Sequence, residues 1–175
     1  MGAAISNRGQ VVDGFLSGDI FVASETWWAL VPSTVTAADV TINTDSDLAF
    51  MLATAVAVTG ANLSAPWDPS GSLPAVATHL SGAATIPSVS GVTTTNANDI
   101  VLFFQDVFSV LSPLLTGPPG FTQLSYSEAV QAFIGLTVYT QVSSEHVSSV
   151  ISETLTATSG AQTTWIVTAD AVRAA

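Results

Sequence analysis

The residue types that most often carry out catalysis are scarce in this chain and form no known catalytic pattern. Its two histidines, His79 and His146, lie far apart in the sequence, and there is no cysteine to act as a thiolate nucleophile. The chain has no Gly-x-Ser-x-Gly elbow, no phosphate-binding glycine loop and no His-x-x-x-His zinc pair. We therefore expect no catalytic residue, no metal site and no cofactor.

Carboxyl pairs are the next candidates, because glycoside hydrolysis uses two acids that flank a cleft. The pairs to consider are Asp68 with Asp106 and Glu128 with Glu145, but their flanking residues are typical of loops and strand edges. Among 13 acidic residues, some pair will always fit such a pattern. The sequence thus favours a non-enzymatic protein, and a polysaccharide depolymerase domain is the last of the alternatives.

Tryptophans and one apolar segment are the candidate contacts with a partner or ligand. Trp27 and Trp28 are adjacent, and neighbouring strand residues face opposite ways, so we expect one in the core and the other exposed. Trp67 lies in a proline-flanked stretch, and Phe108–Leu115 (FSVLSPLL) is mostly apolar. An exposed indole ring can stack on a sugar or fill an oligomer contact. The candidate assembly or ligand contacts are Trp27, Trp28, Trp67, Phe108, Leu111 and Leu114.

The charge balance excludes two classes of partner. The 175 residues include no lysine and only two arginines, Arg8 and Arg173, against 13 acidic residues, which gives a net charge of −11. Such a surface repels phosphate, so we expect binding neither to nucleic acid nor to an anionic membrane. The longest apolar run, Leu48–Val58, is shorter than the about 20 residues of a spanning helix. The first ten residues show no basic region followed by an apolar core, so no signal peptide is expected.

Short segments of β-type pattern, separated by turn residues, follow one another along the chain. Two turns are expected, a tight one with left-handed dihedrals at Asn96–Asp99 and a break at Gly117–Gly120. Gly60–Ala84 is expected to be a long connection, and Ile151–Thr158 and Thr164–Ala171 to form a hairpin. The other expected strands are Ile20–Ala23, Thr26–Val31, Val35–Asn43, Leu48–Val58, Ile100–Phe104 and Phe133–Gln141, with Ile100–Phe104 and Phe133–Gln141 central.

These patterns predict an all-β fold with eight to ten strands and no helical periodicity. An antiparallel two-sheet β-sandwich of jelly-roll-like type is the architecture that fits. Residues 1–17 are expected to be a flexible N-terminal arm, and residues 18–175 a single β-sandwich domain.

Several small-residue and turn motifs belong together: Pro87-Ser88-Val89, Thr93–Thr95, Asn98-Asp99-Ile100-Val101-Leu102, the Gly117–Thr122 turn (GPPGFT) and the aromatic Trp165. Together they resemble a β-sandwich domain of tailed-phage virion proteins, such as tail-fibre and capsid-decoration modules. The resemblance covers about Ala49–Ala171. Gly18–Val22 (GDIFV) only echoes the opening strand of that domain. The resemblance implies assembly rather than catalysis, and it transfers no active-site residue.

The function expected from these observations is that of a non-enzymatic virion structural protein, a capsid-decoration or tail-fibre subunit. Its partners would be copies of itself and other virion proteins, and it would be made in the host cytoplasm. The alternative is a carbohydrate-binding or adhesin module, in which an exposed tryptophan stacks on a host-surface glycan.

Overall fold

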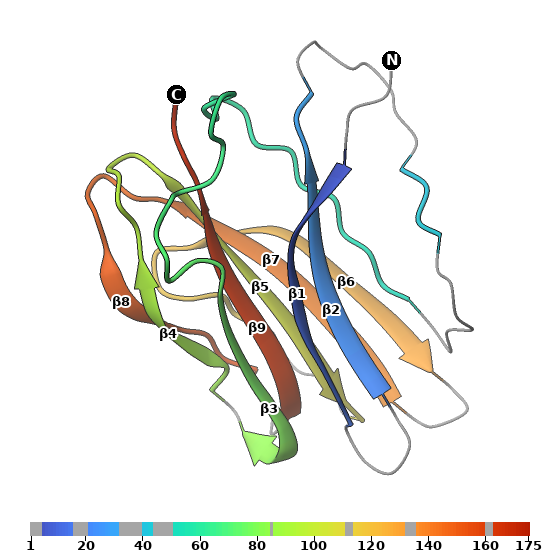
Figure 1. The fold of residues 1–175 in the computed structure, drawn as a ribbon. Coiled ribbons are helices and arrows are strands. Elements are labelled where there is room, and N and C mark those ends of the chain that lie inside the picture. Colours follow the sequence, from blue (N-terminus) through green and yellow to red (C-terminus); the bar gives the residue numbers. More distant parts are fainter. Residues whose placement is uncertain are drawn as a thin grey trace.

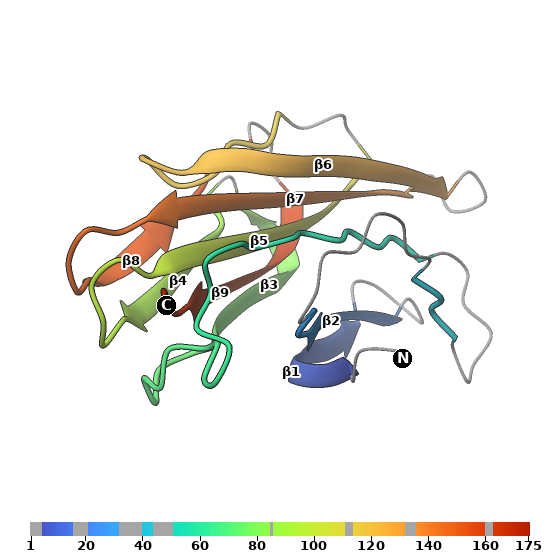
Figure 2. The same cartoon turned by 90° about the horizontal axis from the view of Figure 1, so that it is seen from above.

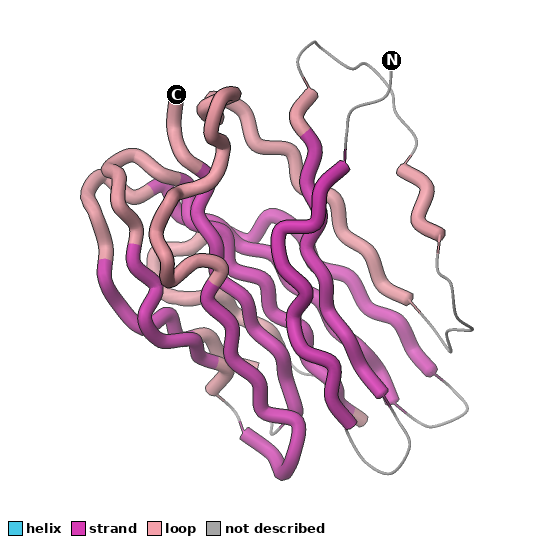
Figure 3. Tube along the Cα trace, viewed as in Figure 1, coloured by secondary structure: helices cyan, strands magenta, loops and turns pink. Residues whose placement is uncertain are grey.

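The computed structural model describes residues 5–15, 21–31, 40–43, 51–84, 86–110, 114–131, 136–159 and 163–175. Within these ranges the chain forms strands, turns and extended segments, and no described residue is helical (Figure 3). Accordingly, the described residues include no helix able to cross a membrane. The nine strands are β1 (Ile5–Phe15), β2 (Phe21–Ala29), β3 (Ala75–Ala84), β4 (Ser88–Thr93), β5 (Ile100–Ser109), β6 (Thr122–Gln131), β7 (Leu136–His146), β8 (Ser152–Thr156) and β9 (Thr163–Val172).

A five-stranded antiparallel sheet in the order β3-β9-β5-β7-β6 is the centre of the molecule (Figure 1). Strand β5 lies in the middle and pairs with β7 on one side and β9 on the other along its whole length. It begins directly after a tight turn in which Asn98 adopts a φ of 66°, the left-handed conformation that asparagine tolerates better than most residues. The strands at the two edges of this main sheet are β3 and β6.

Two smaller antiparallel sheets, β4-β8 and β1-β2, accompany the main sheet and lie apart from one another (Figure 2). The sheet β4-β8 packs on the face formed by alternate residues of β5 and β9, among them Val101, Phe103 and Val167. The hairpin β1-β2 contacts the opposite face, where Ser24 hydrogen bonds Asp106. Successive strand residues point to opposite faces. One set of alternate residues of the main sheet therefore faces β4-β8, and the other set faces β1-β2.

The larger core lies between the main sheet and β4-β8. Fully buried Val89 and Val92 of β4 and Leu155 of β8 meet Phe103 and Val107 of β5 there. Phe121 stands edge-on to Phe103, with ring centroids 6.3 Å apart. A smaller core beneath the hairpin joins Val22, Phe108, Val138 and Ile166.

The predicted all-β, antiparallel fold is confirmed, and the packing of smaller sheets on a main sheet is consistent with a β-sandwich. The central positions expected for Ile100–Phe104 and for the described part of Phe133–Gln141 are confirmed in β5 and β7. The Asn96–Asp99 turn and the break at Gly117–Gly120 are also confirmed.

Several expected elements differ from the structure. Ile151–Thr158 and Thr164–Ala171 do not form a hairpin, because β8 pairs with β4 while β9 inserts between β3 and β5. Within the expected arm 1–17, Ile5–Phe15 is strand β1, which pairs with β2. The expected connection Gly60–Ala84 includes strand β3.

Two further expected strands, Val35–Asn43 and Leu48–Val58, are wrong for the parts that the structure describes, because neither part is a strand. The residues 51–59 are extended with alternating burial but pair with no described strand, and half-buried Leu52 packs on the smaller core. Residues 40–43 are exposed and irregular. The rest of both expected strands, 35–39 and 48–50, lies outside the described residues.

Candidate functional site

The paired tryptophans of β2 face opposite ways, as expected for neighbouring strand residues. Trp27 is 55% exposed, and its indole N–H donates to Glu25 Oε2 at 2.9 Å. Trp28 is half-buried and meets Trp67 edge-on, with ring centroids 6.0 Å apart. Of the three candidate tryptophans, Trp27 is therefore the one whose ring is mainly open to solvent.

Trp67 belongs to a charged contact that ties the hairpin to the main sheet. A register shift between Asn7 and Gly9 makes Arg8 an extra residue of β1. Its Nε donates to Asp170 Oδ2 at 2.7 Å and its Nη2 donates to Asp170 Oδ1 at 3.1 Å. The same guanidinium lies 4.7 Å from the centre of the Trp67 ring. Burial raises the pKa of Asp170, and the Arg8 guanidinium opposes that effect.

This arrangement holds Arg8 rather than offering it to a ligand. Its guanidinium uses two nitrogens on a buried carboxylate and one face on an aromatic ring, the geometry of a bidentate ion pair and a cation–π contact. Trp67 is itself fixed by backbone pairing with Val172 at the end of β9. We conclude that Arg8, Trp67 and Asp170 form a structural clamp.

The apolar segment expected to provide contacts divides between core and surface. Phe108 is not available to a partner, because it is a buried residue of β5 in the core beneath the hairpin. Leu114 is exposed, and Leu111 lies outside the described residues. The alternation of β5 explains the position of Phe108, which follows Leu102, Phe104 and Asp106 on the face covered by β1-β2.

The most unusual ionisable group in the described chain is a pair of buried carboxyls, Asp68 and Asp99, which are 2% and 0% exposed. The Asp68 carboxylate accepts hydrogen bonds from the backbone N–H of Thr95 at 2.7 Å and of Ser70 at 2.7 Å. It also accepts from Thr95 Oγ1 and from Asn96 Nδ2, each at 3.0 Å. These donors leave Asp68 well satisfied as an anion.

Asp99 differs, because donors reach only one of its two oxygens. Its Oδ1 accepts from the N–H of Ala174 at 3.4 Å, whereas its Oδ2 is buried and receives no donor. A proton on Asp99 shared with Asp68 resolves this, since a protonated carboxyl donates to a neighbouring carboxylate. Burial, together with the adjacent Asp68, raises the pKa of Asp99 to about 6. Burial would also raise the pKa of Asp68, but its hydrogen bonds, the one from Asp99 first, lower that pKa to about 2.

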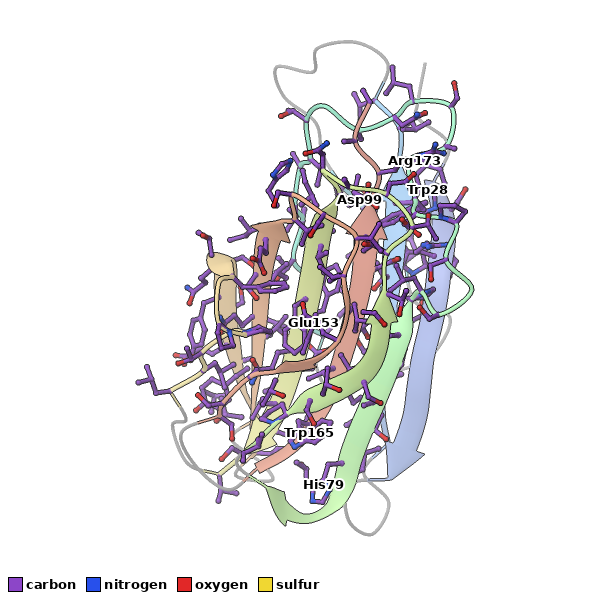
Figure 4. All side chains as sticks on the ribbon, turned by 90° about the vertical axis from the view of Figure 1, so that its left-hand side faces the viewer. Trp28, His79, Asp99, Glu153, Trp165 and Arg173 are labelled. Carbon is purple, nitrogen blue, oxygen red and sulfur yellow. The ribbon has the colours of Figure 1, made fainter. Side chains whose placement is uncertain are left out.

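Two carboxyls that share a proton are the chemical requirement of an acid–base dyad. Here both side chains are closed to solvent, and the oxygens of Asp68 are occupied by protein donors. A substrate therefore has no approach to the pair. The pair joins the Asp68 loop, the turn before β5 and the chain at Ala174. Figure 4 shows Asp99 at the same end of the molecule as Arg173 and Trp28.

The acid and histidine pairs considered from the sequence are not brought together. His79 pairs with Trp165 and His146 with Ile100, which pairs in turn with Val172, so about seven strand residues or roughly 23 Å separate them. Figure 4 shows His79 beside Trp165 at one end of the sheet, where their rings stack at 5.7 Å.

The carboxyl pairs are likewise separated. Asp106 is half-buried beneath the hairpin, where it accepts from Ser24 Oγ and Thr140 Oγ1, each at 2.7 Å, while Asp68 lies beside Ala171 near the end of β9. Glu128 lies opposite Tyr139, six residues along β7 from Glu145, which is roughly 20 Å. Neither arrangement flanks a cleft.

A groove of about 680 Å³ lies between the Gly117–Gly120 turn and β8. Leu115, Pro118 and Phe121 give it an apolar wall, and the Gln141 amide lies beneath. With its nitrogen toward the Leu115 carbonyl and its oxygen toward the Gly117 N–H, each at 3.2 Å, the Gln141 amide is satisfied by the turn itself. The polar group at the base of the groove thus supports the turn.

Strand β6 carries exposed apolar side chains that sequence reasoning did not select. Tyr126 and Val130 are 42% and 68% exposed, and Leu124 is also exposed. The alternating pattern of TQLSYSEAVQ indicates a strand. The sequence does not indicate that this strand lies at the edge of the sheet with its apolar side chains uncovered, which only the fold shows. The Asp68–Asp99 pair left no sequence signal, because the fold alone brings the two residues together.

No group of three or more His, Asp or Glu side chains among the described residues could hold a metal ion. Comparison with protein-family models, with curated proteins and with solved structures finds no match to the chain.

Proposed function

We propose that this protein is a non-enzymatic structural subunit that works through protein–protein assembly contacts. The observation that carries the proposal is the uncovered edge of the main sheet at β6, with Leu124, Tyr126 and Val130 exposed on it. Exposed apolar side chains on an open sheet edge are the surface that strand-to-strand association buries.

The use of the charged groups supports the same proposal. Arg8 and Asp170 join the hairpin to the sheet, Asp106 bonds Ser24 of that hairpin, and Asp68 and Asp99 join three chain segments. Each of these groups is occupied in holding the fold together. The exposed surface that is left for a partner on β6 is mainly hydroxyl and apolar in character.

A virion is the setting that we propose for this assembly, as a capsid-decoration or tail-fibre subunit made in the host cytoplasm. That setting rests on the resemblance of Pro87-Ser88-Val89, Asn98–Leu102 and the Gly117–Thr122 turn to phage β-sandwich domains. Its partners would be copies of itself and other virion proteins. A surface of net charge −11 suits crowded copies that must stay soluble.

Light scattering on fractions from size-exclusion chromatography, over a wide range of protein concentration, tests the assembly. We expect the molar mass to rise with concentration to that of a defined oligomer. A protein that stays monomeric throughout would contradict the proposal. Labelling of the chain in intact particles with a specific antibody then tests the virion setting, and particles that carry no label would exclude it.

The second candidate function is glycan binding, and Trp27 is the one observation in its favour. Its ring is 55% exposed, and its N–H is oriented by Glu25, as in a platform on which a sugar stacks. A glycan array probed with the unaltered protein and with Trp27→Ala tests it. Binding that disappears in Trp27→Ala, by a protein that remains monomeric, would favour this function over assembly.

A further inference from the structure

The outer edge of β6 is a strand edge with free backbone groups. In the main sheet β6 pairs only with β7, and no other described strand pairs with it (Figure 2). On its outer side, the N–H and C=O groups of alternate residues therefore have no partner strand within the part of the chain that the structure describes. A sheet edge of this kind is completed by another strand, because only a strand matches the spacing of its donors and acceptors.

The edge lacks most devices by which proteins prevent such pairing. Known devices are lysine or several charges on the strand, proline, and bulges that interrupt the edge. The ten residues of β6 (TQLSYSEAVQ) contain no lysine, no arginine and no proline, and their one charge is Glu128. Their one irregularity lies between Gln123 and Ser125, so the strand is regular from Ser125 to Gln131.

We propose that a second copy of this chain pairs antiparallel with β6, about a twofold axis through Glu128. The inference rests on the proposed assembly function and names its partner and its register. In this register Tyr126 lies opposite Val130 of the second copy, and Val130 opposite Tyr126 of the second copy. Both side chains are on the same face as Glu128, since they are two residues from it on either side. The exposed residues Tyr126 and Val130 thus form two equivalent contacts, one on each side of the twofold axis.

The spacing of the side chains selects this register. Shifting the axis to Ser127 would place Tyr126 opposite Glu128 and carry Val130 to the irregular residue Leu124. Shifting it to Ala129 would place Val130 opposite Glu128 and carry Tyr126 past Gln131, beyond the end of the strand. Only the axis at Glu128 gives both Tyr126 and Val130 an apolar partner within Ser125–Gln131.

Glu128 weakens this pairing and so controls it. In the proposed register two carboxylates lie directly opposite one another, and like charges in that position oppose strand pairing. The chain has no lysine to place between them. Replacing Glu128 by glutamine removes the repulsion and keeps the size of the side chain. We expect Glu128→Gln to tighten self-association about two- to fivefold, whereas in the register centred on Ser127 the same change has little effect.

Cysteine cross-linking tests the register directly, because the natural chain has no cysteine. On an exact twofold axis residue 128 meets itself, so Glu128→Cys should form a disulfide-linked dimer by itself. Tyr126→Cys and Val130→Cys should cross-link when mixed, and each alone should cross-link far less, because opposite strand residues lie within disulfide reach and more distant ones do not. Leu63→Cys, exposed on a loop away from β6, measures random collision.

The outcomes separate this inference from the proposed function. Cross-linking of Glu128→Cys well above Leu63→Cys, with tighter association of Glu128→Gln, is the expected result. Oligomers in light scattering without preferential cross-linking at 128 or between 126 and 130 would overturn the β6 register and leave the assembly function standing. A protein that stays monomeric in light scattering and shows no preferential cross-linking would overturn both the β6 register and the assembly function. Near-ultraviolet circular dichroism confirms that each variant is folded.

Discussion

Replacing Asp99 by asparagine should make the protein more stable at neutral pH while leaving it little changed in acid. Below about pH 6 the buried Asp99 carboxyl carries a proton that it shares with Asp68, because burial raises its pKa from 3.8 to about 6; at neutral pH this buried carboxyl is ionised next to Asp68. An asparagine in its place donates to Asp68 through its amide nitrogen at every pH. Its oxygen still accepts from the N–H of Ala174. The variant therefore keeps the contacts and loses the titration.

The sign and size of the effect follow from linkage. A raised pKa means that the folded state binds the proton more tightly, so stability is lost as pH rises from about 3.8 to about 6 and is constant above that range. At 1.36 kcal/mol per pH unit the loss is at most about 3 kcal/mol. Asp68 acts in the opposite direction at lower pH, since its pKa of about 2 makes stability fall as pH drops below about 3.8. This carboxyl pair is thus most stabilising near about pH 4.

Urea unfolding followed by tryptophan fluorescence, at about pH 4 and about pH 7.5, measures the effect. We expect Asp99→Asn to gain up to about 3 kcal/mol over the native protein at the higher pH and to differ by less than about 1 kcal/mol at the lower. Burial raises the pKa of Asp106 and Asp170 as well, but that contribution is common to both proteins and cancels in the difference. A difference that is the same at both pH values would refute the shared proton.

Asp68→Asn is the matched control. It also removes one carboxylate, but it places an amide nitrogen among the N–H donors of Thr95 and Ser70. We expect it to lower the free energy of unfolding at both pH values by about 2–4 kcal/mol, because buried donors lose a charged acceptor.

Two other substitutions test the clamp and the turn. Arg8→Ala leaves Asp170 as a buried carboxylate without its cation and should lower the free energy of unfolding by about 3–5 kcal/mol, as measured by urea titration. Gly117→Ala places a Cβ 2.6 Å from Ser143 Oγ and 3.1 Å from Ser143 Cβ, so the Ser143 hydroxyl must rotate and the turn must move slightly away from the sheet; we expect a loss of about 1–3 kcal/mol, seen in calorimetry as a melting temperature lower by about 2–12 °C.

Each of these substitutions has a control of the same chemistry. Arg173→Ala removes an equal charge at a half-buried residue that has no salt bridge within the described chain, so its effect should be much smaller than that of Arg8→Ala. Gly71→Ala adds a Cβ that meets no atom within 4 Å. Equal losses within either pair would show that charge or composition, and not the contact, sets the stability.

The elements that could be predicted from the sequence are those whose signal is local. The Asn-Ala-Asn-Asp turn and the apolar run after it located β5, because asparagine tolerates a left-handed residue and a strand buried on both faces has no polar face. The opposite orientations of Trp27 and Trp28 follow from the same two-residue period.

The pairing of distant segments could not be predicted from local pattern. Ile151–Thr158 and Thr164–Ala171 are separated by few residues, which favoured a hairpin, yet each finds its partner far away along the chain. The Asp68–Asp99 pair has the same origin, since the loop that carries Asp68 is positioned by backbone bonds to the end of β9. The strand β1 was missed because small and polar residues dominate its sequence, ISNRGQVVDGF.

The insertion of β9 between β3 and β5 determines the order in which the main sheet can form. Strand β9 is the last of the nine to be synthesised, and both of its neighbours precede it by many residues. Until it arrives, β3 has no partner in this sheet and one edge of β5 is open. Before β9 is made, the main sheet can contain only β5, β7 and β6, which pair with one another without it. Until β9 has been synthesised, the main sheet therefore has an incomplete core and exposed strand edges, the state in which non-local β-folds are most prone to associate wrongly.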